Sequence, residues 1–163
     1  DRLADATPVS TPFPFTDTSP IDWATVETEE VESSTCFGHS KSVWWQFTPS
    51  QSGIYTLDTA GSEKYLYLSV WTGTNHPLTE VDCDDSFLYA RTRLQLDAVA
   101  GTTYYIRIGG SSIDLGAAVL TVDGPFFPPS NDDLADAIVR FAELRKRRTQ
   151  VAGGMPRHLR ATA

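Results

Sequence analysis

The stretch SVWWQFTPSQSGIYTLDT, residues 42–59, decides the fold because it contains two short runs with the period of a β-strand. In the first run, Val43, Trp45 and Phe47 share one face. The second run begins at residue 54, and the turn-rich residues 49–53 between the two have the length of a hairpin connection. An isolated hairpin is barely stable in water, so a second sheet must cover this face. We therefore expect Trp45 to lie in a core between two sheets.

The same short-strand pattern continues through residues 1–123. Phe13 and Phe15 are expected to anchor an edge strand or extended arm, because Pro12 and Pro14 cannot donate the hydrogen bonds of a central strand. Further short strands are expected over residues 23–29, 65–71, 78–82, 91–98, 104–108 and 117–122. The pattern predicts an all-β fold, an antiparallel jelly-roll sandwich of about eight or nine strands.

The chain changes character after residue 123. The proline-rich residues 124–130 (GPFFPPS) read as a hinge, residues 131–150 as one amphipathic basic helix, and residues 151–163 as a basic tail. Aspartates in the first turn and basic residues in the last turn complement the helix dipole. The residues predicted to dock this helix onto an assembly are Leu134, Ile138, Phe141, Arg145, Arg147 and Arg148.

Charge is unevenly distributed along the chain. Residues 1–130 hold 6 basic and 17 acidic residues, a net charge of −11, whereas residues 131–163 hold 7 and 4, a net charge of +3. The acidic body should repel nucleic acids and anionic membranes, so a nucleic-acid partner is not expected. We expect the basic helix to dock on the acidic body of its own or a neighbouring copy. No apolar run approaches the roughly 20 residues of a membrane span, so no span is predicted.

Two cysteines, Cys36 and Cys83, lie in expected loops next to strands. An even cysteine count in an aromatic-rich, lysine-poor β protein favours one disulfide and an oxidising location. The alternative is a pair of unrelated buried thiols.

Four segments carry a resemblance when they are taken together: DRLADAT, SVWWQFTPSQSGIYTLDT, LSVWTGTNHPLTEVDCDD and AGTTYYIRIGG. The combination resembles the pre-peptidase C-terminal type of β-sandwich domain from bacteria. The likeness covers residues 1 to about 123, and a second opening, NDDLADA, begins at Asn131. Arg2 stands where the family has aspartate. The resemblance implies a non-catalytic accessory module of secreted actinobacterial proteins, with similar units in tail proteins of their bacteriophages.

The residues indicate no catalytic site. His39, His76 and His158 fall in a loop, a turn and the tail, without the spacing of a metal site or a nucleophile motif. The two cysteines are too far apart in sequence for a zinc ribbon or a redox motif. We therefore predict that the chain is not an enzyme and needs no cofactor.

Three carboxylates, those of Asp82, Asp84 and Asp85, lie within four residues. The simpler interpretation is a solvated acidic loop whose aspartates cap turns. The alternative is a structural calcium site, because a hard cation would relieve the repulsion among them. The family resemblance adds Asp1, since related units hold calcium near their opening.

Several aromatic residues are expected on outward-facing strand positions. Trp44, Tyr55 and Trp71 are candidates for surface binding, because exposed rings on a sandwich stack on sugars or anchor a protein. The alternative is that the same rings fill the core.

These observations predict a non-catalytic extracellular binding or structural module of a larger surface assembly, for example a phage virion protein in a minor tail or appendage that contacts the host envelope. Its partners would be proteins of that assembly, in a homo- or hetero-oligomer, with a cell-surface glycan as a further ligand. Its location would be extracellular, on a cell surface or on a virion. The alternative is an accessory adhesion or secretion domain of a secreted hydrolase.

Overall fold

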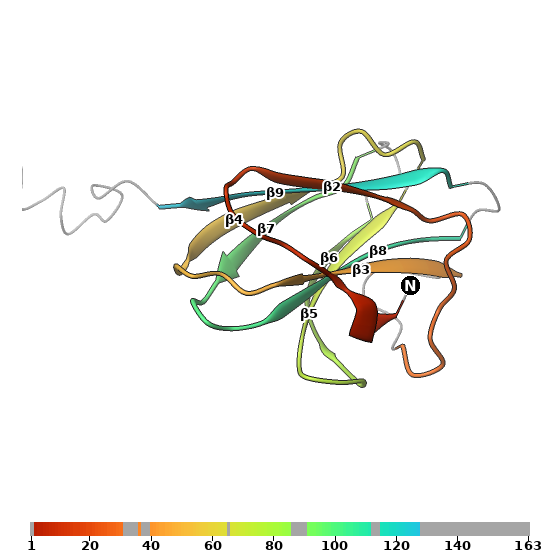
Figure 1. The fold of residues 1–163 in the computed structure, drawn as a ribbon, viewed down its shortest axis with the longest axis horizontal. Coiled ribbons are helices and arrows are strands. Elements are labelled where there is room, and N and C mark those ends of the chain that lie inside the picture. Colours follow the sequence, from red (N-terminus) through yellow and green to blue (C-terminus); the bar gives the residue numbers. More distant parts are fainter. Residues whose placement is uncertain are drawn as a thin grey trace, which may run out of the picture. The chain divides into compact units, whose positions relative to one another are not determined.

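The computed structural model describes residues 2–30, 36, 40–64, 66–85, 91–111 and 115–127, and this part of the chain forms nine strands in two sheets (Figure 1). The five-stranded sheet has the order β1 (Thr7–Pro8), β3 (Lys41–Phe47), β8 (Tyr104–Gly110), β5 (Tyr67–Thr72) and β6 (Thr79–Asp84). The four-stranded sheet has the order β2 (Phe15–Pro20), β9 (Ala117–Phe126), β4 (Gly53–Asp58) and β7 (Arg93–Ala98). A short 3-10 helix, η1 (Leu3–Asp5), precedes β1. The predicted all-β fold is confirmed.

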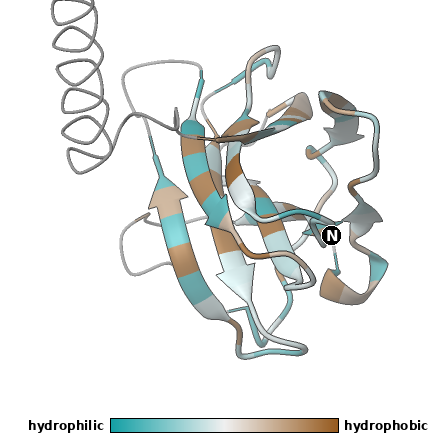
Figure 2. Cartoon of the chain, turned by 90° about the vertical axis from the view of Figure 1, so that its left-hand side faces the viewer, coloured by the Kyte–Doolittle hydropathy of each residue, from teal (hydrophilic) through white to brown (hydrophobic). Residues whose placement is uncertain are grey.

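The inward faces of both sheets share the main hydrophobic core. Val43, Trp45 and Phe47 of β3 point into this core, and the side chain of Trp45 is 1% exposed. In β7 the same alternation buries Leu94 and Leu96 from the opposite sheet. Strands coloured by hydropathy carry alternating bands along their length (Figure 2). The period of two in the sequence therefore sets which face of each strand is buried.

The chain before β3 contributes one strand to each sheet. β1 pairs with β3 in parallel over two residues, whereas the other strand pairs are antiparallel. β2 lies at the edge of the four-stranded sheet, the position predicted for the segment that begins with Pro12 and Pro14. The ring of Phe13 meets those of Phe47 and Tyr55 edge to face, with centroids 6.2 and 5.5 Å apart. Phe13 is thus the anchor that the sequence indicated.

β9 runs three residues beyond the predicted end of the sandwich. Phe126 lies opposite Ile54 of β4, so residues 124–126 belong to a strand and not to the predicted hinge. Gly124 makes this possible because its φ is 138° and a Cβ there would come within 2.8 Å of the Ile54 carbonyl oxygen. The pairing of β4 with β9 shifts its register between Ile54 and Thr56, and this irregularity accommodates the unusual backbone at Gly124.

Residues 23–29 form no strand, contrary to the expectation from their alternation. The amide of Ala24 donates to the carbonyl of Ile21, and the amide of Glu30 donates to that of Glu27, both at 3.1 Å, which are turn contacts. The Trp23 side chain is 91% exposed. The segment is a loop because its polar side chains bond to other parts of the fold, as described below.

The chain divides into two compact units, Asp1–Phe126 and Phe127–Ala163. The predicted helix over residues 131–150, with all six of its docking residues, and the tail over residues 151–163 lie outside the described residues. Within the described ranges, no helix has both the length and the apolar character to cross a membrane.

Cys36 and Cys83 form a disulfide, as predicted. The bond joins positions 47 residues apart and ties the buried Cys36 to the edge strand β6. A cross-link over this span mainly restricts the unfolded chain.

We expect the double variant Cys36→Ser/Cys83→Ser to lose about 4 kcal/mol of unfolding free energy, the value of the chain-entropy model for this loop. Urea denaturation of the full chain measures the loss, and the reduced wild-type protein serves as the control because it should match the variant. A loss below about 1 kcal/mol would contradict the expectation.

Asp58 is a buried carboxylate on the outer side of the four-stranded sheet. It accepts hydrogen bonds from the Arg91 guanidinium, with Nε 2.8 Å from Oδ1, and from the amide of Ala60 at 2.8 Å. Burial acts to raise the pKa of Asp58, but these hydrogen bonds and the charges of Arg91 and Arg93 outweigh it and hold the pKa below its ordinary value of 3.8.

Because this pKa is lowered by folding, the stabilisation is present above pH 3.8 and is lost as the pH falls through the lower folded-state value. The variant Asp58→Asn should lose about 1–3 kcal/mol at pH 7 and show a weaker fall in stability below pH 4 than the wild type. Thermal unfolding between pH 7 and pH 2.5 tests this. The variant Asp97→Asn, altered at an exposed position of β7, should behave like the wild type.

Candidate functional site

A second hydrophobic cluster lies on the outer face of the five-stranded sheet. It contains Leu3, Trp44, Trp71 and Leu78, with Tyr105 partly buried against it. Trp44 and Trp71 are 4% and 2% exposed, so the prediction that their rings are available on the surface is wrong. Strand alternation places both rings on the outer face, but η1 and the β5–β6 hairpin, which supply Leu3 and Leu78, cover them there.

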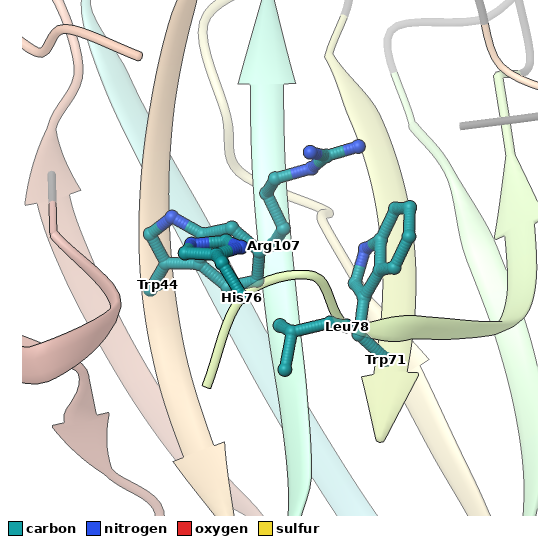
Figure 3. A pocket seen from close by; sticks show the side chains of 5 residues that line it. All are labelled: Trp44, Trp71, His76, Leu78 and Arg107. Carbon is teal, nitrogen blue, oxygen red and sulfur yellow. The ribbon is translucent and has the colours of Figure 1, made fainter. Parts of the chain in front are cut away.

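Arg107 lies at the centre of this face. It is on β8 directly opposite Trp44 of β3, and its guanidinium carbon lies 5.4 Å from the ring centroid of Trp44 and 4.6 Å from that of Trp71 (Figure 3). Both distances are within the range of a cation–π interaction. Ser69 accepts hydrogen bonds from Trp71 Nε1 at 2.8 Å and from Arg107 Nε at 3.3 Å. The hollow between Arg107, Trp44, Trp71, His76 and Leu78 has no room for a water molecule.

The charge of Arg107 is compensated by Glu30. Nη1 of Arg107 lies 3.7 Å from Oε1 of Glu30, and the two side chains are 4% and 0% exposed. Oε2 of Glu30 accepts hydrogen bonds from the amide of Glu27 at 2.8 Å and from the Ser42 hydroxyl at 3.1 Å. The ion pair therefore holds the loop of residues 21–30 against the sheet. We call Arg107, Trp44, Trp71, Ser69 and Glu30 the arginine cluster.

Asp22 holds the other end of this loop. Its Oδ1 accepts hydrogen bonds from the amides of Gly116 at 2.9 Å and Leu115 at 2.6 Å and lies 3.9 Å from Nζ of Lys41. The Gly116 and Leu115 hydrogen bonds are the main reason that the pKa of Asp22 is below its ordinary value. The loop is thus attached at both ends through carboxylates.

The loop, η1 and the β5–β6 hairpin enclose a cleft of about 310 Å³, which we call the acidic cleft. This volume is at the lower end of the range found for small-ligand sites. Tyr105 of β8 contributes an aromatic side chain to the lining. The residues that line the cleft are Leu3, Ala4, Glu27, Glu29, Thr74, Asn75, His76 and Tyr105.

Polar groups meet at the acidic cleft. Oε2 of Glu27 accepts a hydrogen bond from the amide of Leu3 at 2.8 Å and lies 3.4 Å from Nε2 of His76. Within the described part of the chain, Nδ1 of His76 is buried without a hydrogen-bond partner, and so is Nε1 of Trp44. The His76 and Trp44 rings meet edge to face with centroids 6.0 Å apart, so the imidazole links the cleft to the arginine cluster.

The remaining polar side chains of the cleft are available to a ligand. Glu29, Thr74 and Asn75 are exposed, and within the described ranges their side chains take part in no hydrogen bond or ion pair. Among the described residues, no lysine or arginine lines the cleft. Carboxylate, amide and hydroxyl groups around an aromatic ring can bind a polar or cationic ligand without covalent chemistry.

The other predicted site residues lie apart from this cleft. Tyr55 is buried in the main core, so its surface role is also wrong. Asp82 accepts from the amide of Cys83 and Asp84 from that of Arg93, both at 2.8 Å. Asp85 follows them, and Asp1 lies outside the described residues. In the described ranges no three His, Cys, Asp or Glu side chains converge as a metal site would require.

Sequence reasoning missed the two residues that organise this face. Arg107 carried a usable signal, because it is the one charged residue in YYIRIGG, a strand whose other side chains are apolar or aromatic. His76 carried none, since a histidine in a turn is unremarkable. Glu27 and Glu29 fall in the segment whose alternation predicts a strand that does not form, although their acidic character also fits an exposed loop.

We expect Arg107→Leu to lose about 3–5 kcal/mol of unfolding free energy, because the Glu30 carboxylate would remain buried without the guanidinium. Adding Glu30→Leu should restore a large part of the loss. Denaturation followed by tryptophan fluorescence measures both. The control is Arg93→Leu at an exposed position of β7, which should cost less than about 1 kcal/mol, and equal losses in the two arginine variants would contradict the role of Arg107.

A scan against models of known protein families found no match for this chain, and a search of curated proteins found none either.

Proposed function

We propose that this protein is a non-catalytic extracellular binding and structural module of a larger surface assembly, and that the acidic cleft is its contact site. The observation that carries the proposal is the convergence of Glu29, Thr74 and Asn75 on one cleft while their side chains have no partner among the described residues. Groups of this kind, held on an anchored loop and a hairpin, are suited to binding.

We also propose that the sandwich is a jelly roll of the pre-peptidase C-terminal type. The strand order supports the jelly roll, because β2, β9, β4 and β7 form one sheet and β3, β8, β5 and β6, together with the short β1, form the other. Apart from the β5–β6 hairpin, successive strands from β2 to β9 alternate between the sheets, which is the connectivity of two Greek keys. In its most specific form, the proposal is that the protein belongs to a phage virion and contacts the host envelope.

The disulfide supports an oxidising location, since such bonds persist mainly in secreted and surface proteins. The only described histidine, His76, has Glu27 as its hydrogen-bonding partner. The disulfide and the His76–Glu27 contact both agree with a rigid module that binds a partner, and neither requires a reaction at the cleft.

The proposal is tested with the fluorescently labelled full chain and envelope preparations of the source or host bacterium. Filling the cleft through Ala4→Trp should abolish binding, because Ala4 is an exposed residue of its lining. Thr18→Trp, at an exposed position of β2 on the other sheet, is the matched control and should bind like the wild type. Equal binding by the wild type and Ala4→Trp, or turnover of an envelope component, would refute the proposal.

A further inference from the structure

We propose that the acidic cleft takes a lysine or arginine side chain presented by a protein partner. The inference rests on the proposed function and names the chemistry of the ligand. The charge, the apolar groups and the size of the cleft all favour such a ligand.

The charge of the lining selects against anions. Glu27 and Glu29 give the cleft two carboxylates, and among the described residues of the lining the only basic side chain is the imidazole of His76. A carboxylate attracts a cation, and the attraction is stronger at a protein surface than in bulk water. A phosphate, sulfate or carboxylate ligand would meet repulsion of the same size.

Glu29 is the group that distinguishes a cationic from a neutral ligand. Glu27 already accepts from the Leu3 amide and contacts His76, so its role is partly structural. Glu29 is exposed, and its carboxylate makes no hydrogen bond or ion pair within the described ranges. Two carboxylates that line one cleft repel each other unless a positive charge comes between them or water screens them.

The apolar part of the lining suits the stem of a long side chain. Leu3 and Ala4 come from η1 and Tyr105 from β8, whereas the acidic groups come from the loop. Lysine and arginine combine an apolar stem with a charged end, and an arginine also stacks on an aromatic ring. Thr74 and Asn75 supply oxygens that can accept from the charged end.

The size of the cleft favours one side chain over an oligosaccharide. Its volume of about 310 Å³ is enough for a single long side chain, and Tyr105 is the one aromatic residue in the described part of its lining. A glycan site would require polar groups around the whole of the bound sugar and further rings on which to stack. We therefore treat a neutral glycan as an outcome of the test.

The experiment follows the amide spectrum of the nitrogen-15-labelled full chain during titration with acetyl-Gly-Lys-Gly-amide and its arginine analogue. We expect shifts in amides of the cleft lining, including Ala4, Glu29 and Asn75. Glu29→Gln should weaken binding about three- to fivefold, the effect of one partly exposed charge pair. The same peptide with an acetylated lysine amine should not bind. Raising the salt concentration should weaken binding by a similar factor.

Asp97→Asn is the matched control because it removes one exposed negative charge from β7 and should leave the affinity unchanged. Equal weakening by Asp97→Asn and Glu29→Gln would overturn the inference, as would absence of any shift with the charged peptides. Shifts of the cleft amides with N-acetylglucosamine trimer but not with the charged peptides would also overturn it, while leaving the proposed function intact. The envelope assay tests the proposed function separately, through the comparison of binding by the wild type and by Ala4→Trp.

Discussion

The arrangement of the segments that cover the outer face of the five-stranded sheet depends on the buried ion pair between Arg107 and Glu30. A guanidinium in the middle of a sheet is unfavourable unless its charge is met by an opposite charge and its surface by suitable neighbours. Trp44 and Trp71 supply aromatic faces, Ser69 accepts a hydrogen bond, and Glu30 supplies the charge. Because Glu30 belongs to a loop and not to a strand, this requirement brings the loop onto the sheet.

The acidic cleft is a consequence of that arrangement. The Glu30 carboxylate accepts from the amide of Glu27, and the Glu27 carboxylate in turn accepts from the amide of Leu3. A chain of short contacts thus runs from Arg107 to the amino-terminal segment. His76 approaches the same carboxylate from the β5–β6 hairpin. Three segments far apart in sequence, η1, the loop of residues 21–30 and the β5–β6 hairpin, therefore meet at the acidic cleft.

The main core and the disulfide could be predicted because they depend on local patterns. The alternation in residues 42–59 placed Trp45 inside, and two cysteines in an aromatic β protein indicated one bond between them. The surface role of Trp44 and Trp71 could not be judged in the same way. Alternation correctly put them on the outer face, but whether an outer face meets water depends on what covers it, and that cover comes from distant segments.

The sequence by itself determined the two-sheet architecture, the buried face of each strand and the acidic character of the body, because each follows from side-chain period or composition. The tertiary structure alone decided that residues 23–29 form a loop, that the tryptophans are covered and that Glu27 and Glu29 share a cleft with His76 and Tyr105. The physical reason is that a buried charge is unfavourable unless an opposite charge lies next to it, and the fold can bring that charge from any part of the chain. Glu30, an ion-pair partner of Arg107, lies 77 residues away along the chain, and no local pattern encodes that contact.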